Sequence, residues 1–342
     1  MQPERPGGVG RSLHNLVPRF VGHADVTLLL DDSLPPLDLD VAQVRLRAPL
    51  RQASVSWVQW SAARWLRGFD GVFHGPFYVT PALLPVPGVV SLHDISWEHR
   101  PEWFSRGRRL SFQLQSRRAA RTARVVITVS QYVKRDIVET YGVDPERILV
   151  AGHGVDPVFS PGATDPEVSA RLGLSERYVV ALGGAARRNL SVAVEAWRLA
   201  REAGADAQLV VVGKERPAPQ PGLVYAGFAS DNDLAALLAG STAFLYPTEY
   251  EGFGMPGLEA LGSGTVVVAA PVTSLPEVLG DAAEWAESTR PEHLARALTT
   301  VLQDDSGLPE RRRRSLAQAA ALPGWEEAAE VHLEAYRRAA EG

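Results

Sequence analysis

The sequence predicts an α/β protein of two lobes, each built on a doubly wound and mainly parallel β-sheet. Three observations support this. The chain has 342 residues, more than the roughly 250–300 at which one hydrophobic core stops growing. Short aliphatic runs alternate with amphipathic segments of helical length, which is typical of parallel sheets covered by helices on both faces. A glycine- and proline-rich segment, residues 152–165, interrupts this alternation near the midpoint.

Eight aliphatic runs predict strands, and the amphipathic segments predict helices. The runs are 26–30, 71–74, 89–92, 125–129, 178–182, 209–212, 243–246 and 265–269. The helical segments include 51–66, 108–123, 131–141 and 190–203. Because the glycine- and proline-rich segment separates the lobes, we place them at 1–158 and 159–324. A last helix, within 325–342, is expected to close the second lobe or to cross back to the first.

Composition excludes several classes of function. The net charge is -5 and the chain holds no cysteine. The charge offers no general attraction to nucleic acid, and the lack of cysteine excludes disulfides, thiolate metal sites and thiol catalysis. No apolar run approaches the roughly 20 residues of a membrane span, and the first residues lack the apolar core of a signal peptide. We therefore expect a cytoplasmic protein that at most lies against the inner face of a membrane.

The segment 247–262, PTEYEGFGMPGLEALG, carries the strongest functional signal. It follows a predicted strand and opens a helix near Met255, because Pro256 suits a first helical turn. The amides at such a helix end attract anions, and Gly252 and Gly254 let a ligand approach the backbone closely. The segment is therefore suited to a diphosphate or to the hydroxyl edge of a sugar.

Two glutamates support this interpretation. Glu251 lies in the loop before the helix and Glu259 about one turn into it, so both carboxylates can face one ligand. Carboxylates accept hydrogen bonds from hydroxyl groups, in which sugars are rich. The alternative is a surface loop with two solvated glutamates, one of them merely favourable near a helix N-terminus.

A basic turn provides the opposite charge. Arg187 and Arg188 follow the predicted strand 178–182 and its Gly183-Gly184 turn, at the carboxyl end where open parallel sheets bind ligands. Two cations there can hold a diphosphate and offset the charge that grows on it as a glycosidic bond breaks. The alternative is a solvated basic turn.

The segment Glu251 to Glu259, EGFGMPGLE, resembles the paired-glutamate motif of retaining glycosyltransferases of family 4, which have the GT-B fold. Further resemblances follow the family's order along almost the whole chain. They are Gly7-Gly8-Val9-Gly10-Arg11, His93-Asp94, Ser130, Gly154-Val155-Asp156, Arg187-Arg188-Asn189, Ser274-Leu275-Pro276-Glu277-Val278 and Trp325-Glu326. Singly most of these are weak signals, and in this order they are strong.

The resemblance implies a hexosyltransferase that moves a sugar from a nucleotide diphosphate donor, held mainly by the second lobe, to an acceptor held mainly by the first. Retention of the anomeric configuration follows from it. The implied donor-binding residues are Gly8, Gly10, Gly183, Arg187, Arg188, Glu251, Gly252, Phe253, Gly254, Met255 and Glu259. The implied catalytic residues are His93, Glu251, Arg187 and Arg188. Arg188 is a departure, because the family usually has lysine at this position.

The first lobe departs from the family at its start. The family has a strand before the glycine loop, whereas this chain has only MQPERP there. Either the start is displaced or the first sheet lacks a strand that is usually central, which would leave its neighbours with unpaired edges. His93 ends the predicted strand 89–92, where related enzymes use a histidine near the transferred sugar. We expect it to act by positioning, and we interpret His74 and His153 as structural.

The stretch 97–124 holds eight arginines against two acids, with aromatic residues among them. It predicts either contact with an anionic membrane or a phosphorylated lipid acceptor, or a solvated basic helix face. No metal or cofactor is expected, since no cluster has ligand spacing and the arginines can supply the electrostatic stabilisation.

The donor and the acceptor are predicted with different degrees of detail. The segment 274–283, SLPEVLGDAA, resembles bacterial mannosyltransferases and makes GDP-mannose the first expected donor, with UDP-sugars second. The acceptor, whether a glycan, a lipid-linked sugar or a small molecule, is not indicated. A phosphorylase would need a pyridoxal-bearing lysine, and the second lobe has only Lys214. A non-catalytic protein that kept the GT-B fold remains the alternative function.

Overall fold

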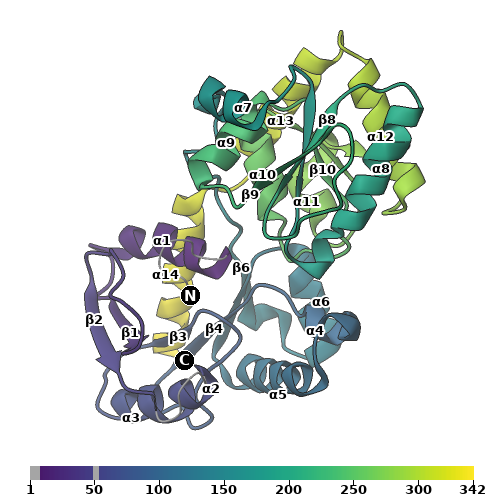
Figure 1. Ribbon diagram of the computed structural model, residues 1–342. Coiled ribbons are helices and arrows are strands. Elements are labelled where there is room, and N and C mark those ends of the chain that lie inside the picture. The colour runs from purple at the N-terminus through teal and green to yellow at the C-terminus, as the bar shows by residue number, and fades with distance from the viewer. Residues whose placement is uncertain (1–7, 49–53) are drawn as a thin grey trace. The chain divides into compact units, whose positions relative to one another are not determined.

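A computed structural model describes residues 8–48 and 54–342 (Figure 1). The chain forms two compact units, of which the first comprises residues up to Gly154 together with Pro323–Gly342, and the second comprises Val155–Leu322. The expected fold class, α/β with parallel sheets, is confirmed. The first unit extends to Gly154, earlier than the predicted boundary at 158. A Cβ at this glycine would lie 2.6 Å from the backbone nitrogen of Trp325, so the chain here packs on the terminal helix.

The strands of the first unit fall into two parallel sheets. A two-stranded sheet pairs β1 (Thr27–Asp31) with β2 (Ala42–Leu46). A four-stranded sheet has the order β3 (Phe73–Gly75), β4 (Gly88–Leu92), β5 (Val125–Thr128) and β6 (Ile148–Val150). Within the described residues no strand joins the two sheets, so β1 and β2, like β3 and β6, are edge strands. The residues MQPERP, on which the prediction of a missing strand rests, lie outside the described part of the chain.

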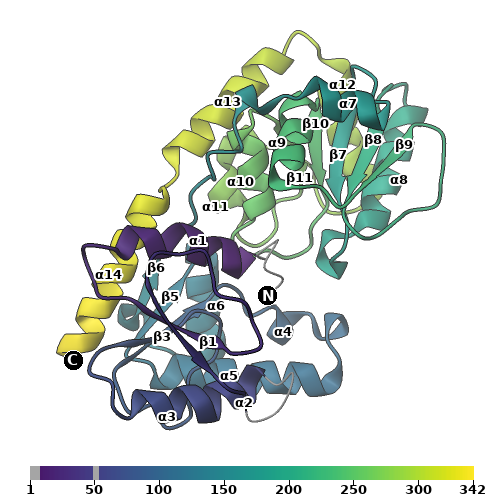
Figure 2. The ribbon, with the colours of Figure 1, turned by 60° about the vertical axis from the view of Figure 1, so that its left-hand side comes forward.

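Helices of the first unit cover its four-stranded sheet. They are α1 (Gly8–Phe20), α2 (Ser54–Ser56), the π-helix η1 (Trp57–Ala62), α3 (Ala63–Leu66), α4 (Ser96–His99), η2 (Pro101–Trp103), α5 (Arg106–Thr122), α6 (Gln131–Tyr141), η3 (Pro145–Arg147) and α14 (Trp325–Glu341). The predicted helix 51–66 is therefore continuous from Ser54 to Leu66, with a π-helical stretch at its centre, and residues 51–53 lie outside the described residues. Ala335 and Ala339 of α14 pack against the sheet. Figure 2 shows α14 and α1 side by side.

The second unit is built on one six-stranded parallel sheet with the order β12-β11-β10-β7-β8-β9. Its strands are β7 (Tyr178–Leu182), β8 (Gln208–Val212), β9 (Leu223–Gly227), β10 (Ala243–Tyr246), β11 (Val266–Ala269) and β12 (Glu284–Trp285). Its helices are η4 (Pro161–Ala163), α7 (Pro166–Leu172), η5 (Ala186–Arg188), α8 (Leu190–Glu202), α9 (Asp231–Gly240), α10 (Met255–Gly262), α11 (Leu275–Leu279), η6 (Gly280–Ala282), α12 (Pro291–Gln303) and α13 (Leu308–Ala321). One core cluster joins β7, β8, β10 and β11 to α8 and α12.

The strand order of the second unit places a topological switch point between β7 and β10. From β7 the chain proceeds outward through β8 and β9, and it then returns to β10 and proceeds in the other direction through β11 and β12. The connections that leave β7 and β10 therefore diverge, and open α/β sheets bind ligands at the carboxyl ends of strands at such a point. Within the described residues, none of the helices combines the length and the apolar character needed to cross a membrane.

Candidate active site

The loop after β10 ends in a helix start that only glycine accommodates easily. Gly254 is the N-cap of α10 and has a φ of 99°, in the left-handed region. A Cβ there would also lie 2.6 Å from Cδ2 of Leu275, so both conformation and space favour glycine. Pro256 lies in the first turn, where a missing amide costs nothing. The sequence thus sets the start of α10 at Met255, as predicted.

Glu251 is buried in this loop, and its carboxylate is held from two sides. The hydroxyl of Tyr246, the last residue of β10, donates a hydrogen bond of 2.8 Å to Oε1 of Glu251. Nε of Arg187 lies 3.5 Å from the same oxygen. Burial, followed by the charge of Glu251, raises the pKa of Tyr246 well above its ordinary value, so Tyr246 stays neutral and able to donate.

The backbone of Glu251 is held as well. Its amide donates a 3.0 Å hydrogen bond to Oγ1 of Thr273, and its carbonyl accepts a 2.9 Å hydrogen bond from Oγ of Ser274. Thr273 has a φ of 50°, which is uncommon for a β-branched residue. Such strain is maintained only where surrounding contacts fix it, and it is concentrated at functional sites.

The turn after β7 provides the two predicted arginines. Arg187 and Arg188 end the short helix η5, and Asn189, with a φ of 53°, is the N-cap of α8. Nη1 of Arg188 donates a 2.9 Å hydrogen bond to the carbonyl of Gly183, and this bond holds the guanidinium of Arg188 in place. Gly183 is itself buried, and a Cβ there would lie 3.0 Å from Leu190 and 3.3 Å from Glu215.

Hydrogen bonds join the β7 turn to the β10 loop. The carbonyl of Arg187 accepts from the amide of Glu249 and from Oγ1 of Thr248, each at 3.1 Å. Nδ2 of Asn189 donates a 2.8 Å hydrogen bond to Oε1 of Glu249. The loops on either side of the switch point therefore form one connected structure, with the arginines and Glu251 on it.

This cluster, which we call the switch-point site, combines the parts needed to bind a diphosphate sugar. It consists of Gly183, Arg187, Arg188, Glu251 and the start of α10. Two cations and the positive end of the α10 dipole favour an anion, and a carboxylate can accept hydrogen bonds from sugar hydroxyls. The predicted residues Gly252, Phe253 and Gly254 are buried in the loop, Met255 is half-buried, and Glu259 is buried on α10.

The other predicted residues belong to the first unit. His93 is half-buried at the carboxyl end of β4, and its Nε2 donates a 3.1 Å hydrogen bond to the carbonyl of Pro76. Its ring stacks on that of His153, with the centroids 5.8 Å apart. Burial lowers the pKa of His93, so the imidazole is neutral at pH 7 and leaves Nδ1 as an acceptor.

Gly8 and Gly10 are placed differently from the prediction. The resemblance implies a glycine loop here, whereas α1 begins at Gly8 and contains both glycines. Oγ of Ser12 donates a 3.0 Å hydrogen bond to the carbonyl of Gly8, and this bond supports the first turn. Gly7, the other glycine of the motif, lies outside the described residues.

Sequence reasoning missed the residues that support Glu251. Tyr246 is predicted only as a strand residue, and Thr248 and Thr273 are not among the predicted site residues. The last residue of a parallel strand points to the ligand-binding edge, so the position of Tyr246 was a usable signal. Thr273 offered none, because its role depends on a contact across 22 residues.

Comparisons with known proteins agree on one family. Residues 6–159 match the family model described as Glycosyltransferase Family 4, and residues 176–304 match Glycosyl transferases group 1. O-antigen chain mannosyltransferase B of Escherichia coli is 29% identical over 315 residues, which cover 86% of this chain and 78% of that protein. The MMP alpha-(1->4)-mannosyltransferase of Mycolicibacterium hassiacum is 30% identical over 242 residues, 67% of this chain and 57% of that protein.

Solved structures with low sequence identity share the fold. WaaG, a glycosyltransferase involved in lipopolysaccharide biosynthesis, aligns with a TM-score of 0.75 at 17% identity and covers 97% of both chains. Anabaena HepE in complex with UDP and glucose aligns with a TM-score of 0.75 at 18% identity, over 98% of this chain and 97% of that one. The chain is therefore a glycosyltransferase of the GT-B fold, and it belongs to glycosyltransferase family 4.

Proposed function

We propose that the protein is a retaining mannosyltransferase that uses GDP-mannose. The observation that supports the donor site is the switch-point site itself, where Arg187 and Glu251 lie 3.5 Å apart on loops leaving adjacent strands. We infer that the diphosphate lies against Arg187, Arg188 and the start of α10, and that the sugar hydroxyls reach Glu251. Further residues of the second unit that we assign to donor binding are Glu259 and the loop glycines Gly252 and Gly254.

The choice of mannose rests on the relatives. Two of them are named as mannosyltransferases, and another as a GDP-mannose-dependent mannosyltransferase, 34% identical over 137 residues. UDP-sugars are the second choice, because HepE was solved with UDP-glucose. The acceptor remains a glycan, a lipid-linked sugar or a small molecule.

The chemistry that we propose is a front-face displacement. The bond between the anomeric carbon and the diphosphate oxygen breaks, and the acceptor oxygen bonds to that carbon from the same face. The acceptor's proton passes to a donor phosphate oxygen, and GDP leaves with the bonding electrons. Arg187 and Arg188 offset the charge that grows on the diphosphate, so we propose that no metal is needed. An inverted product, or a trapped glycosyl-enzyme adduct, would contradict this mechanism.

Donor binding tests the proposal directly. Thermal shift would be measured with GDP-mannose, GDP, UDP-glucose and UDP, with and without EDTA, for the wild type, Glu251→Gln and Arg188→Ala. We expect a shift with GDP-mannose that persists in EDTA, and about a tenfold or larger loss of affinity in each variant. Arg313→Ala is the matched control, since its side chain is 75% exposed on α13 of the same unit.

The outcomes separate the alternatives. A thermal shift seen only with UDP-sugars would show that the donor carries uracil rather than the proposed guanine. Binding without hydrolysis or transfer to any of a panel of methyl mannosides would favour a protein that kept the fold without the chemistry. No shift with any nucleotide, in protein that is folded by circular dichroism, would reject the switch-point site as a donor site.

A further inference from the structure

Exposed apolar side chains gather in one region of the first unit. Among the described residues, seven large apolar side chains are exposed, and most of them lie on or beside α5. The exposed fractions are 71% for Trp60, 88% for Leu83, 56% for Leu110 and 62% for Leu114. The glycosyltransferase chemistry proposed above assigns no role to any of these residues. Exposed apolar groups that cluster in this way mark interaction surfaces.

Hydrogen bonds at the carbonyl of Thr80 bring together the chain segments that carry these exposed apolar side chains. Nε2 of Gln59, next to Trp60, donates a 3.0 Å hydrogen bond to the carbonyl of Thr80. Nη2 of Arg118, one turn after Leu114, donates to the same carbonyl. The amide of Ala82, next to Leu83, donates a 2.6 Å hydrogen bond to Oε1 of Gln59. The chain segments that carry Trp60, Leu83 and Leu114 are therefore adjacent to one another.

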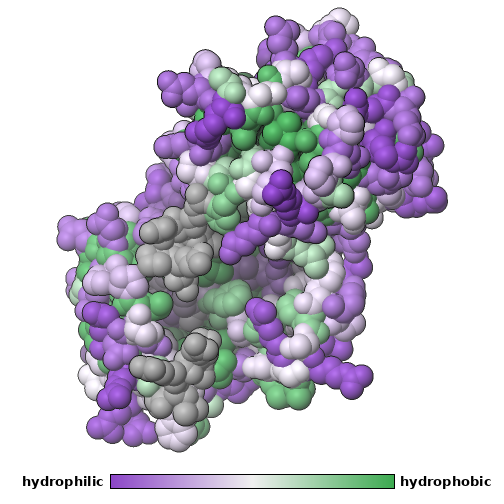
Figure 3. All heavy atoms as spheres, viewed as in Figure 1, coloured by the Kyte–Doolittle hydropathy of each residue, from purple (hydrophilic) through white to green (hydrophobic). Residues whose placement is uncertain are grey.

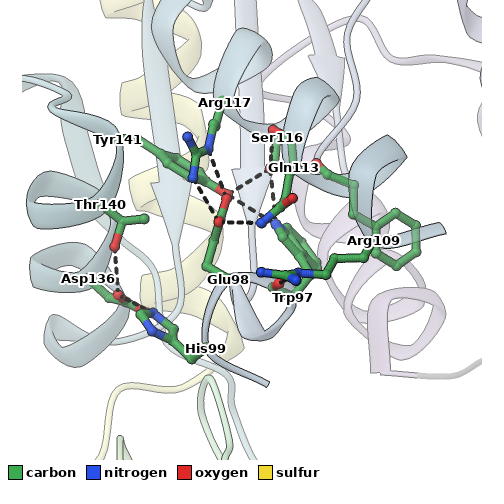
Figure 4. A network of polar contacts seen from close by, with 11 residues as sticks. Trp97, Glu98, His99, Arg109, Gln113, Ser116, Arg117, Asp136, Thr140 and Tyr141 are labelled. Atoms are coloured by element: carbon green, nitrogen blue, oxygen red, sulfur yellow. Dashed lines mark hydrogen bonds and ion pairs between the residues drawn. The ribbon is translucent and has the colours of Figure 1, made fainter. Parts of the chain in front are cut away.

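The inner side of α5 is fixed by a polar network, which determines what its outer side presents (Figure 4). Oγ of Ser116 lies 2.7 Å from the hydroxyl of Tyr141, and Nε1 of Trp97 donates to both groups. Arg117 binds the buried carboxylate of Glu98 at 2.8 Å. Because the helix cannot roll without breaking these bonds, Leu110 and Leu114, four residues apart, stay directed to solvent.

The surroundings of the leucines are strongly basic. Residues 104–124 contain seven arginines and no aspartate or glutamate. Arg106, Arg108 and Arg121 are exposed near the two ends of α5. Of the two acids just before this stretch, Glu98 is bound by Arg117 and by Nε2 of Gln113, and Glu102 pairs with Arg100. Where Figure 1 places α5, Figure 3 shows apolar surface next to strongly hydrophilic surface.

We propose that this surface, the α5 face (Trp60, Leu83, Leu110, Leu114 and the exposed arginines of α5), docks the protein on an anionic lipid bilayer. Exposed leucines and a tryptophan insert at the boundary of headgroups and acyl chains, while arginines with long apolar stems bind the phosphates. Charge complementarity favours an anionic bilayer over a protein partner, because residues 104–124 around the two leucines contain seven arginines and no aspartate or glutamate. The docking requires no donor, so it stands independently of the proposed reaction.

Vesicle co-sedimentation of the whole chain tests the proposal. The vesicles are phosphatidylcholine alone or with 30 mol% phosphatidylglycerol as a chosen composition, at low and high salt. We expect binding only to the anionic vesicles, weakened by salt. Leu110→Ser with Leu114→Ser should weaken binding about tenfold or more, and Arg106→Gln with Arg108→Gln by about tenfold. All four positions are exposed, so the variants should keep the wild-type melting temperature.

Matched controls come from the second unit. Phe228→Ser replaces a side chain that is 52% exposed, and Arg313→Gln with Arg314→Gln removes two exposed cations from α13. Both should bind as the wild type does. The proposal is overturned if anionic vesicles are not bound, if neutral vesicles are bound equally well, or if the controls lose as much binding as the α5 variants. It is also overturned if the leucine variant converts a dimer to a monomer without changing vesicle binding.

Discussion

At the scale of single residues, the carboxylate of Glu251 depends on a neutral partner. Tyr246 and Glu251 are both buried, and the hydroxyl lies 2.8 Å from the carboxylate oxygen. A hydrogen bond to a charged group contributes about 1.5–3 kcal/mol, against about 0.5–1.5 kcal/mol for a neutral pair. Tyr246 is therefore a positioning residue, since it acts on a ligand only through Glu251.

Tyr246→Phe should lower the unfolding free energy by about 1.5–3 kcal/mol because a buried carboxylate loses its donor. Urea denaturation measures this loss. The control is Tyr178→Phe in the same sheet, where the buried hydroxyl donates a 3.0 Å hydrogen bond to the neutral carbonyl of Leu237. Equal losses in the two variants would show that the charge of Glu251 plays no part. Restoration of stability in Tyr246→Phe with Glu251→Gln would confirm the coupling.

The candidate site was predicted unevenly at this scale. Arg187, Arg188 and Glu251 could be predicted because their residue types and their positions after strands carry the chemistry. Their convergence follows from the adjacency of β7 and β10. Tyr246 could have been found from its place at the end of β10, whereas Thr273 acts through a contact that forms only in the folded loop, so no local pattern indicates it. Whether the predicted residues bind a donor stays a prediction.

At the scale of elements, α10 depends on the backbone of its cap. Gly254→Ala should lower the unfolding free energy by about 2–4 kcal/mol, since a left-handed φ costs about 1 kcal/mol and a contact with Leu275 adds a packing penalty. Gly173→Ala is the control, because Gly173 caps α7 with a φ of 65° and no atom lies within 4 Å of its added Cβ. Chemical denaturation should show the larger loss at Gly254, and equal losses would remove the packing argument.

Strands were predictable in proportion to their burial. β4, β5, β7, β10 and β11 are buried along their whole length, and each follows a predicted aliphatic run within a residue or so. The strands that were missed are β2, β6, β9 and β12, and each lies at an edge of its sheet. β6 and β12 are only three and two residues long, and β2 carries the polar residues Gln43 and Arg45, so none of these three forms the longer apolar run that reveals a buried strand.

At the scale of the whole molecule, buried histidines distinguish the two units. The chain has eight histidines, of which only His293 belongs to the second unit. In the first unit, His74 contacts His332 and His93 contacts His153, with ring centroids 5.7 and 5.8 Å apart. Burial is the largest cause that lowers the pKa of all four, and their mutual charges lower the pKa of His74, His153 and His332 further.

The direction of the resulting pH dependence follows from linkage. Because each folded-state pKa lies below the unfolded one, the unfolded chain binds more protons, and stability falls as the pH drops below about 6.5. The pKa of His332 is lowered to about 4, so this histidine alone should reduce the unfolding free energy of the first unit by about 2 kcal/mol between pH 8 and pH 5. The other three act in the same direction.

Tryptophan fluorescence during urea denaturation can measure this in one unit, because six of the eight tryptophans belong to the first unit. We expect the denaturation midpoint to fall steeply from pH 6.5 to pH 5. His332→Leu should flatten that slope by up to about 1.4 kcal/mol per pH unit, and His23→Gln, at an exposed position, is the control variant. The dependence of the unfolding free energy on pH is informative even if His332→Leu is less stable at every pH. Lost packing lowers the unfolding free energy equally at all pH values, because it does not change proton uptake. The opposite result would be a wild-type denaturation midpoint that does not change between pH 6.5 and pH 5. It would mean that the histidine cluster is already solvated in the folded state, so that acid does not destabilise the first unit through these histidines.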